Sequence, residues 1–234
     1  MKINLFGMIE KKKKVRQIFE GIAHRYDFLN HLLSLGFDFY WRKKALALTK
    51  MNDESILLDI ACGTGDFAIA AKKNGVEKIF GADFSMNMLT LFKKKSNWID
   101  GKVVQMVAED IPLQNDSVTN ITVAFGVRNF YDIPSGFNSF YRVLKQGGKA
   151  TILEFRMPSN KIFKGLYKFY FKKVLPVVGG IISGDREAYS YLPNSVEEFD
   201  EKIVLPELLK KAGFKEIKVH PLTLGIVQVV IAAK

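Results

Sequence analysis

The fold of this chain is decided by residues 57–66, which read LLDIACGTGD. An apolar run ends in an acid, turns through two glycines and continues into the helix-forming segment 67–71. This order predicts a strand, a tight turn and a helix. Gly63 and Gly65 carry no Cβ, so the backbone can come close to a ligand, and the start of the helix directs N–H groups toward it. Open α/β sheets bind nucleotides at such turns.

Two ligands fit this turn. Residues 63–68 match the G-x-G-x-x-A fingerprint of dinucleotide sites. Asp59 favours S-adenosylmethionine instead, because an acid at the strand end suits a cationic ammonium and would repel a pyrophosphate. Asp83 ends the next apolar stretch, at a distance along the chain that suits a carboxylate binding ribose hydroxyls. A plain strand-to-helix turn with capping acids is the simpler alternative.

Composition limits the class of protein. The 234 residues are 48% hydrophobic and suit one α/β domain with an extension. Lys and Arg number 35 against 24 Asp and Glu, a net charge of +11, which favours nucleic acid or an anionic membrane as partner unless it only aids solubility. Cys62 is the single cysteine, which rules out an intramolecular disulfide. Without a signal peptide or a bilayer-spanning run, a cytoplasmic protein is expected.

Strand and helix patterns alternate along most of the chain, which predicts a parallel sheet. Two closely spaced strands follow near the C-terminus and suit an antiparallel pair. The pattern predicts a Rossmann-like sheet of seven strands, mostly parallel with an antiparallel last strand and helices on both faces. Ser85 should cap one helix, and the glycines of residues 145–148 should end another. The expected strands are 56–61, 78–83, 103–108, 120–125, 149–155, 214–220 and 225–232, and the expected helices are 65–73, 86–96, 135–144 and 206–212.

The segments outside this alternation have their own character. Residues 1–14 read as a basic arm, and residues 15–35 and 39–48 as helices that cap the ligand site. Residues 1–50 therefore form the arm and cap, and residues 51–234 the cofactor-binding domain with an insertion at 156–200. In that insertion, aromatic residues and lysines intermingle before a flexible apolar stretch, so that residues 161–182 suit a membrane interface. A helix packed on the sheet or a nucleic-acid surface are the alternatives.

Several segments resemble one known family. Residues 19–30, FEGIAHRYDFLN, are similar to the entry segment of the ubiquinone/menaquinone biosynthesis C-methyltransferases, which are class I S-adenosylmethionine-dependent methyltransferases. Residues 124–129, AFGVRN, resemble the family signature after the fourth strand. The remaining similar segments are 81–89, 142–148, 153–155, 189–195 and 222–227.

The resemblance implies methyl transfer from S-adenosylmethionine to the ring of a demethylated polyprenyl quinol, with demethylmenaquinol favoured over a benzoquinol. It implies no metal, and the three scattered histidines suggest no ligand cluster. The lipid substrate implies peripheral attachment to the inner membrane through residues 161–182. A monomer and a homodimer both fit.

Three rivals explain less of the sequence. A nucleic-acid methyltransferase would use the basic charge, but the motif of amino-methylating enzymes is absent after the fourth strand. The one cysteine lies in the cofactor turn and cannot serve cytosine methylation. An NAD(P)-dependent oxidoreductase leaves Asp59 unexplained. Methylation of another small molecule by the same cofactor remains an alternative.

The resemblance and the strand ends together predict the site. Arg128 is a poor direct base, so it would stabilise a quinolate or hold a proton-accepting water with Asn129. Asp27 could accept a proton, and Tyr26 could complete the wall. Alternatively, Arg128 forms a structural salt bridge, Tyr26 packs in the core, and Asp27 is a helix-surface acid or a salt-bridge partner. The expected cofactor residues are Asp59, Gly63, Thr64, Gly65, Asp83, Phe84, Val107, Ala108 and Ala124.

Several positions depart from the family pattern, among them Val118 and Thr119 in place of Phe-Asp and Gln146 in place of a proline. Val107 replaces the usual Asp or Asn, so the adenine amino group would need a backbone contact, or Glu109 or Asp110. Ala61 replaces the first glycine of the cofactor turn.

Overall fold

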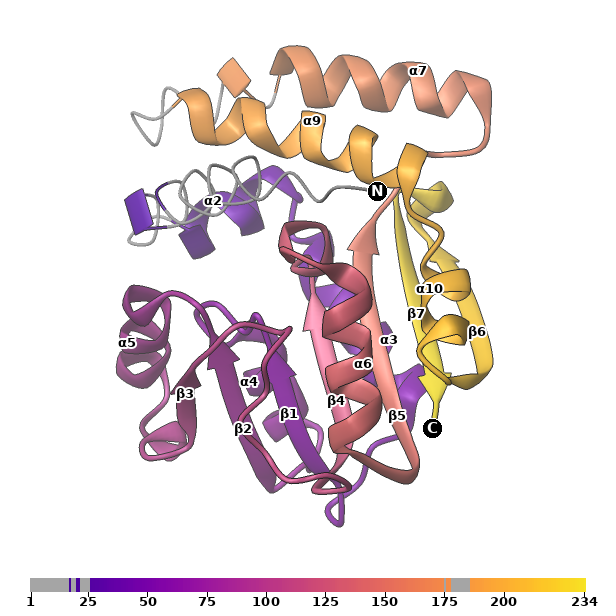
Figure 1. Ribbon diagram of the computed structural model, residues 1–234. Helices are drawn as coiled ribbons and strands as arrows, with labels where there is room; N and C mark the ends of the chain where they lie inside the picture. The colour runs from indigo at the N-terminus through magenta and orange to yellow at the C-terminus, as the bar shows by residue number, and fades with distance from the viewer. Residues whose placement is uncertain (1–16, 18–19, 22–25, 175, 178–185) are drawn as a thin grey trace.

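The structure, a computed structural model, describes residues 17, 20–21, 26–174, 176–177 and 186–234 (Figure 1). Helices follow the first, second and fourth strands along the chain, whereas a loop joins the third strand to the fourth. The strands are β1 (Ile56–Ile60), β2 (Lys78–Asp83), β3 (Val103–Gln105), β4 (Val118–Ala124), β5 (Leu144–Phe155), β6 (Lys215–Leu222) and β7 (Val227–Ala233). The α-helices are α2 (Tyr26–Leu33), α3 (Phe37–Thr49), α4 (Asp66–Lys73), α5 (Met86–Lys95), α6 (Ile133–Val143), α7 (Lys161–Phe169), α9 (Arg186–Lys202) and α10 (Leu205–Lys211). Shorter helical turns are η2 (Asn97–Ile99), η3 (Val127–Asn129), the π-helical η4 (Tyr170–Val174) and η5 (Thr223–Gly225).

The strands form one seven-stranded sheet in the order β3-β2-β1-β4-β5-β7-β6. Strands β1 to β5 pair in parallel, and β7 runs antiparallel to both of its neighbours. This confirms the predicted mostly parallel sheet with an antiparallel last strand. In the register of the central strands, Asp59 lies opposite Gly81 of β2 and Thr122 of β4. Asp59, near the end of β1, is therefore placed in the middle of the sheet.

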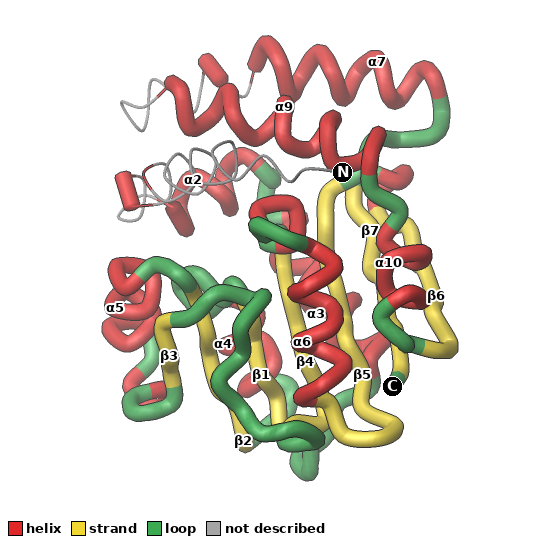
Figure 2. Tube along the Cα trace, in the orientation of Figure 1, coloured by secondary structure: helices red, strands yellow, loops and turns green. Residues whose placement is uncertain are grey.

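Helices cover both faces of the sheet, as predicted (Figure 2). Helices α3, α4 and α5 pack on one face, where Trp41, Phe67 and Phe92 join a core with residues of β1, β2, β5 and β7. Helices α6 and α10 pack on the other, where Phe137 and Leu209 bury against β1, β4, β5 and β7. Removing this apolar surface from water contributes about 25 cal/mol per Å², so each face holds its helices by burial.

The ends of two helices test the capping predictions. Ser85 caps α5 as expected, because its hydroxyl accepts a hydrogen bond of 3.4 Å from the Met88 amide. The predicted glycine C-cap of α6 is wrong, because the chain enters β5 directly at Leu144. The glycines instead meet the end of β7: the Gly147 amide donates to the carbonyl of Lys234 at 3.1 Å, and the Lys234 amide donates to that of Gly148 at 2.9 Å.

A second group of helices lies over the carboxyl ends of the parallel strands. Helices α2, α7 and α9 run together above this edge in Figures 1 and 2. Of the expected helix 15–35, the structure gives α2, and the rest falls mainly outside the described residues. Helix α9 contains Pro193 and was not predicted. Within the described ranges no helix combines the length and apolarity needed to cross a bilayer.

Candidate functional site

The turn between β1 and α4 is built from residues with left-handed backbones. Gly63 and Gly65 have φ values of +54° and +86°, a region that costs glycine nothing. A Cβ on Gly65 would lie 2.1 Å from the Phe92 ring, so this glycine lets α5 pack tightly behind the turn. Gly63 instead faces the two cavities described below. Ala61 also has a positive φ, +51°, at the position where the resembled family has glycine.

Asp59 offers a buried carboxylate at the end of β1. Its Oδ1 accepts a hydrogen bond of 2.6 Å from the Thr122 hydroxyl. Its Oδ2 is buried and has no hydrogen-bond partner among the described residues. Burial raises the pKa of Asp59 to about 7, while the Thr122 hydrogen bond and the charge of Arg42 act in the opposite direction. An unpaired carboxylate oxygen of this kind fits a cation.

Asp83 ends β2 beside the same turn. Its Oδ2 accepts a hydrogen bond of 2.8 Å from the Gly63 amide, and its Oδ1 accepts one of 2.8 Å from the Ser85 amide. Burial raises its pKa to about 6, and these backbone hydrogen bonds lower it. Each carboxylate oxygen can accept a second hydrogen bond, so Asp83 orders the glycine turn and still has acceptors to offer.

A small cavity of about 60 Å³ opens between the ends of β2 and β4. The fold brings together in its lining four residues that were expected to bind the cofactor: Phe84, Val107, Ala108 and Ala124. Glu109 also lines it, and its Oε1 accepts hydrogen bonds of 2.6 and 3.0 Å from the amides of Tyr131 and Asp132. Asp110 does not line this cavity.

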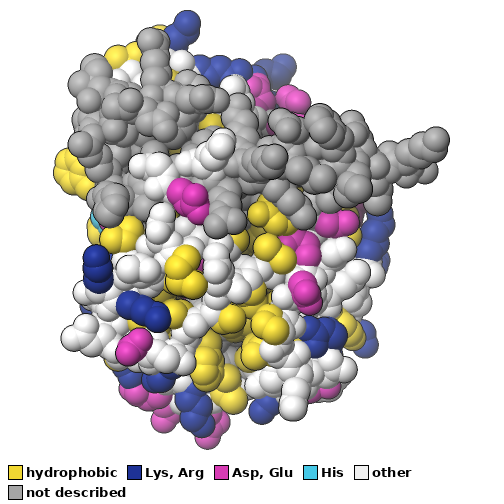
Figure 3. All heavy atoms as spheres, turned by 60° about the vertical axis from the view of Figure 1, so that its left-hand side comes forward, with side chains coloured by type: hydrophobic (Ala, Val, Ile, Leu, Met, Phe, Trp, Pro, Cys, Tyr) yellow, Lys and Arg dark blue, Asp and Glu magenta, His cyan; other side chains and the backbone are white. Residues whose placement is uncertain are grey.

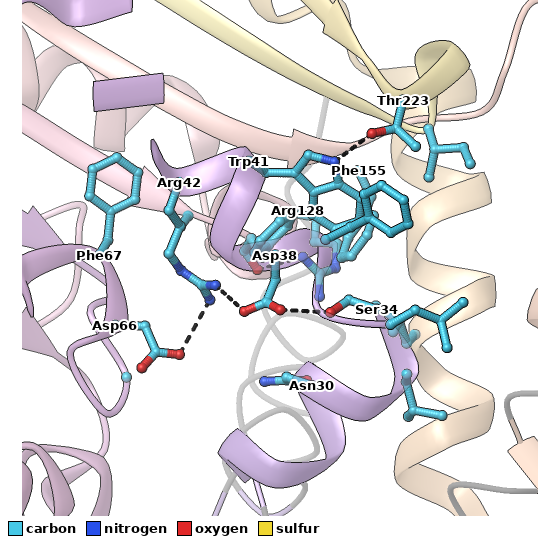
Figure 4. A pocket seen from close by; sticks show the side chains of 18 of the residues that line it. Asn30, Ser34, Asp38, Trp41, Arg42, Asp66, Phe67, Arg128, Phe155 and Thr223 are labelled. Carbon is cyan, nitrogen blue, oxygen red and sulfur yellow. Dashed lines mark hydrogen bonds and ion pairs between the residues drawn. The ribbon is translucent and has the colours of Figure 1, made fainter. Parts of the chain in front are cut away.

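A larger cavity of about 400 Å³ adjoins the small one, because Ala61, Gly63, Ala124 and Phe125 line both. Its floor holds Asp59 and the glycine turn, and its wall is aromatic. Figure 4 shows Trp41 and Phe155 in this wall, with the Trp41 indole N–H directed at Thr223. The other aromatic residues of the wall are Phe37, Phe67, Phe125, Phe163, Tyr167, Tyr170, Phe171 and Tyr191.

Arg128 lies in the wall of the larger cavity, held by a buried acid. Its Nη1 donates to Glu154 Oε1 at 2.8 Å, and its backbone amide donates to Glu154 Oε2 at 3.3 Å. The same Nη1 also contacts the Phe125 carbonyl. Arg128 is 8% exposed and Glu154 is fully buried. Sequence reasoning missed Glu154 as a site residue, although an acid inside the apolar strand β5 is a signal that could have marked it.

Asn129 faces the smaller cavity and is oriented from α9. The Tyr191 hydroxyl donates a hydrogen bond of 2.9 Å to its Oδ1. With its oxygen so engaged, the Asn129 amide group is left to donate. Tyr191 was predicted only as part of a resembling segment, and its link to Asn129 spans 62 residues of sequence.

Asp27 lies at the rim of the site and contributes to neither cavity lining. Its Oδ1 accepts a hydrogen bond from the Thr64 hydroxyl, and its Oδ2 accepts one of 2.7 Å from Lys95. Lys95 also pairs with Asp66 at the start of α4. Asp27 thus ties α2 to the cofactor turn through Thr64. Tyr26 begins α2, and its side chain falls outside the described residues.

A second group of charges joins α2 and α3 to the turn. Asp38 accepts hydrogen bonds from Ser34 at 2.7 Å and from Arg42 (Figure 4). It accepts another from His31 at 2.7 Å. Arg42 reaches Asp66 as well, at 3.5 Å. Ligand atoms of His31, Asp38 and Asp66 lie within 4.8 Å of one another, a grouping that the scattered histidines did not predict. The guanidinium of Arg42 already balances these carboxylates.

On one face of the molecule the basic side chains are dispersed (Figure 3). On the face shown in Figure 3, Lys and Arg side chains stand apart with acidic side chains between them, and hydrophobic side chains gather in the middle. Among the residues coloured there, this face offers no continuous basic patch for a nucleic-acid backbone.

Comparison with known proteins gives one consistent result. A sequence model of the ubiE/COQ5 methyltransferase family matches residues 8–234. The ubiquinone/menaquinone biosynthesis C-methyltransferase UbiE of Geotalea daltonii is 45% identical, over 98% of this chain and 100% of that protein. The demethylmenaquinone methyltransferase of Chlorobaculum tepidum is 43% identical, over 92% and 89% of the two chains.

The fold has solved counterparts. An S-adenosylmethionine-dependent methyltransferase of Thermotoga maritima superposes with a TM-score of 0.67 at 20% identity, over 93% of this chain and 99% of that one. A Haemonchus contortus phosphoethanolamine N-methyltransferase solved with S-adenosylhomocysteine gives a TM-score of 0.57 at 18% identity, over 82% and 52%. At these identities the likeness concerns the fold.

Proposed function

The chain belongs to the ubiE/COQ5 methyltransferase family, and from this premise we propose that it methylates a ring carbon of demethylmenaquinol bound in the larger cavity. It is an S-adenosylmethionine-dependent C-methyltransferase of menaquinone/ubiquinone biosynthesis. The naphthoquinol is favoured because the relatives include demethylmenaquinone methyltransferases. The observation that carries the proposal is the aromatic cavity of about 400 Å³ that opens directly onto the cofactor turn.

The residues present fit the cofactor. The unpaired Oδ2 of Asp59 suits the ammonium of its methionine half. Asp83 would accept from the ribose hydroxyls, and the cavity lined by Phe84, Val107 and Ala108 would take the adenine. Because Val107 has no acceptor, the adenine amino group would meet backbone carbonyls or Glu109. When bound, the cofactor supplies an electrophilic methyl group on a sulfonium.

Arg128 provides the electrostatics for the quinol. Removing the proton of a ring hydroxyl makes the neighbouring carbon nucleophilic and leaves negative charge on the oxygen. Arg128 cannot accept that proton, but its charge, fixed by Glu154, stabilises the oxygen at little reorganisation cost. A water held by Arg128 and Asn129 would take the hydroxyl proton. Methyl transfer would break the methyl–sulfur bond, leaving its electron pair on sulfur, as the carbon–carbon bond forms, and loss of the ring proton to water would then restore the aromatic ring.

Asp27 has a different role in this proposal from the proton acceptor considered at first. Both of its oxygens already accept hydrogen bonds, from Thr64 and Lys95, and it does not line the cavities. We assign it to holding α2 over the cofactor turn.

The isoprenoid tail suits the remaining wall of the cavity and a membrane surface beside it. Phe163 and Leu166 of α7 line the cavity. On the same helix, Ile162, Leu166 and Phe169 are 75%, 62% and 64% exposed, at spacings that place them on one face. Such a face flanked by lysines suits the interface of an anionic membrane, where the substrate resides. Phe171, which also lies within residues 161–182, is buried and does not belong to this face.

The test is methyl transfer from labelled S-adenosylmethionine in detergent. Demethylmenaquinol and the demethylated benzoquinol precursor are supplied in parallel. We expect product with demethylmenaquinol. Product with the benzoquinol alone would overturn the choice of ring, and S-adenosylmethionine binding without product from either quinol would overturn the substrate class.

A further inference from the structure

Tyr167 of α7 belongs to the aromatic wall and is linked to Arg128 through two phenylalanine rings. It is 6% exposed and lines the larger cavity. Its ring packs on Phe171 with centroids 4.2 Å apart, and Phe171 meets Phe155 at 6.0 Å. The guanidinium carbon of Arg128 lies 5.7 Å from the Phe155 ring centroid. These contacts hold the Tyr167 ring in one place, as part of a buried cluster with Met157.

The hydroxyl of Tyr167 is buried without a hydrogen-bond partner among the described residues. Leaving such a group unpaired is costly, and buried tyrosine hydroxyls usually find a partner. Two neighbours in the same wall follow that rule: Tyr170 donates to the Leu33 carbonyl at 2.8 Å, and Tyr191 donates to Asn129 at 2.9 Å. Tyr167 departs from it, and it does so in a cavity built for a ligand.

A second buried donor in the same wall is also unpaired. The Nε of Arg128 has no hydrogen-bond partner within the described part of the chain, although its Nη1 is engaged by Glu154. Two residues of the cavity lining, Tyr167 from α7 and Arg128 from η3, thus each carry a buried donor without a partner among the described residues. Unused donors on two lining residues call for an acceptor on the ligand, most of all one that carries negative charge.

Tyr167 keeps its proton at all ordinary pH values. Burial raises the pKa of its hydroxyl well above the usual range, and the positive charge of Arg128 only partly offsets that effect. The hydroxyl is therefore a donor and not a base.

We propose that the Tyr167 hydroxyl donates a hydrogen bond to the quinol oxygen that becomes negatively charged, alongside Arg128. This inference rests on the proposed function. It adds Tyr167, a residue on which the proposed function does not depend. The hydrogen bond fixes the ring against the cofactor and strengthens as charge develops on the oxygen. It also lowers the pKa of the bound quinol hydroxyl, so that more of it is ionised near neutral pH.

The experiment is Tyr167→Phe, which removes the one hydroxyl and leaves the ring in its packing. We expect kcat/KM for demethylmenaquinol at pH 7 to fall by about 10- to 100-fold. Affinity for S-adenosylhomocysteine should stay unchanged, and the melting temperature should stay equal or rise because an unpaired buried hydroxyl is lost. Because the quinol pKa rises in the variant, part of the lost rate should return at about pH 9.

Tyr141→Phe is the matched control. Tyr141 packs against Phe214 of the distant face, with ring centroids 5.4 Å apart, and lines neither cavity. It loses the same atom and should keep wild-type kinetics at both pH values.

The outcomes separate this inference from the proposed function. A wild-type enzyme that methylates neither quinol fails the proposed function itself. An active wild type with Tyr167→Phe within about threefold of it, and with the same pH profile, overturns the inference alone. A lowered melting temperature with lost S-adenosylhomocysteine binding also overturns it, because the hydroxyl would then support the fold.

Discussion

At the scale of single residues, the site is a set of buried charges, each held by a specific partner. Asp59 accepts from Thr122 on the neighbouring strand and keeps one oxygen unpaired. The carboxylate oxygens of Glu154 accept hydrogen bonds from Arg128 and from backbone amides, including that of Phe155 at 2.9 Å. The first acid is ready for an external cation, and the second already has an internal one. Environment thus gives two buried carboxylates opposite tasks.

The pKa of Asp59 predicts how cofactor binding depends on pH. With a pKa of about 7 in the free protein, Asp59 is largely protonated at pH 5.5 and must ionise to bind an ammonium. Affinity for S-adenosylhomocysteine, measured by calorimetry, should fall by up to tenfold per pH unit below pH 7. In Asp59→Asn the affinity should be lower, and the pH dependence that remains should lie near pH 6, where Asp83 titrates. A wild-type affinity that does not vary over this range would contradict the assignment.

The same pKa shifts act on the stability of the free protein with the opposite sign. The folded-state pKa values of Asp59 and Asp83, about 7 and about 6, lie above the usual value of 3.8. Their contribution to the free energy of unfolding is therefore fully present near pH 4 and lost as the pH rises through 6 and 7. The pH dependence of unfolding in this window should be shallower in Asp59→Asn.

The Arg128–Glu154 pair predicts a double-mutant result. Glu154→Gln leaves the buried charge of Arg128 without its partner and should lower the free energy of unfolding by about 3 kcal/mol. Adding Arg128→Met should recover most of that loss, because no unpaired charge remains. Methyl transfer should be lost in both proteins. Chemical denaturation with the activity assay checks this, and an active double variant would remove Arg128 from the chemistry.

Sequence alone suggested part of the site, missed Glu154, and did not show how the side chains are paired. The glycine turn, Asp59 and Asp83 follow from local patterns at two strand ends, and the fold places them together. The links of Glu154 to Arg128 and of Tyr191 to Asn129 cross 26 and 62 residues. Such pairings depend on which strands become neighbours and on how α9 lies over them. A lone Tyr167 in an amphipathic helix carries no local signal of an unpaired hydroxyl.

At the scale of elements, the core of the sheet was more predictable than the segments around it. Strand β2 has the expected bounds, because an apolar run between Lys78 and Asp83 is unambiguous. Strand β3 is shorter than expected, since only three of its residues pair with β2. The glycines near residue 147 looked like a helix cap, but they pair with Lys234, far away in sequence. Helix α9 was not predicted, because Pro193 within it has a very low helix propensity.

Helix α7 carries the prediction for membranes. The triple variant Ile162→Ser, Leu166→Ser and Phe169→Ser should lower binding to anionic phospholipid vesicles by at least tenfold, measured by sedimentation. These side chains are well exposed, so the melting temperature should hardly change. The matched control replaces three exposed apolar residues elsewhere, Val104, Val204 and Val219, with serine. Equal vesicle binding by the wild type and the α7 variant would contradict membrane docking through this helix.

At the scale of the whole molecule, α2 and α3 are both tied to the turn between β1 and α4. Asp27 of α2 holds Thr64, and Arg42 of α3 reaches Asp66. The residues proposed to bind the cofactor therefore also contact α2 and α3. A ligand that orders the turn should stabilise these contacts, and the coupling is reciprocal.

Asp27→Ala tests this coupling. The Asp27–Lys95 pair is partly exposed, with side chains 31% and 32% accessible, so the free protein should lose less than about 1 kcal/mol of stability. Affinity for S-adenosylhomocysteine should fall by about five- to tenfold. Calorimetry and thermal melts with and without the ligand measure the two effects. An unchanged affinity would show that α2 and the turn act independently.

The strand order has a consequence for how the protein is made. Strand β7 follows β6 along the chain, yet it lies between β5 and β6 in the sheet. A ribosome delivers β6 first, when no neighbouring strand exists for it to pair with, and β5 keeps an open edge meanwhile. The sheet is completed only when β7 pairs with β5 on one side and with β6 on the other. Chaperone dependence during synthesis should therefore concentrate on the interval between the appearance of β5 and the pairing of β7.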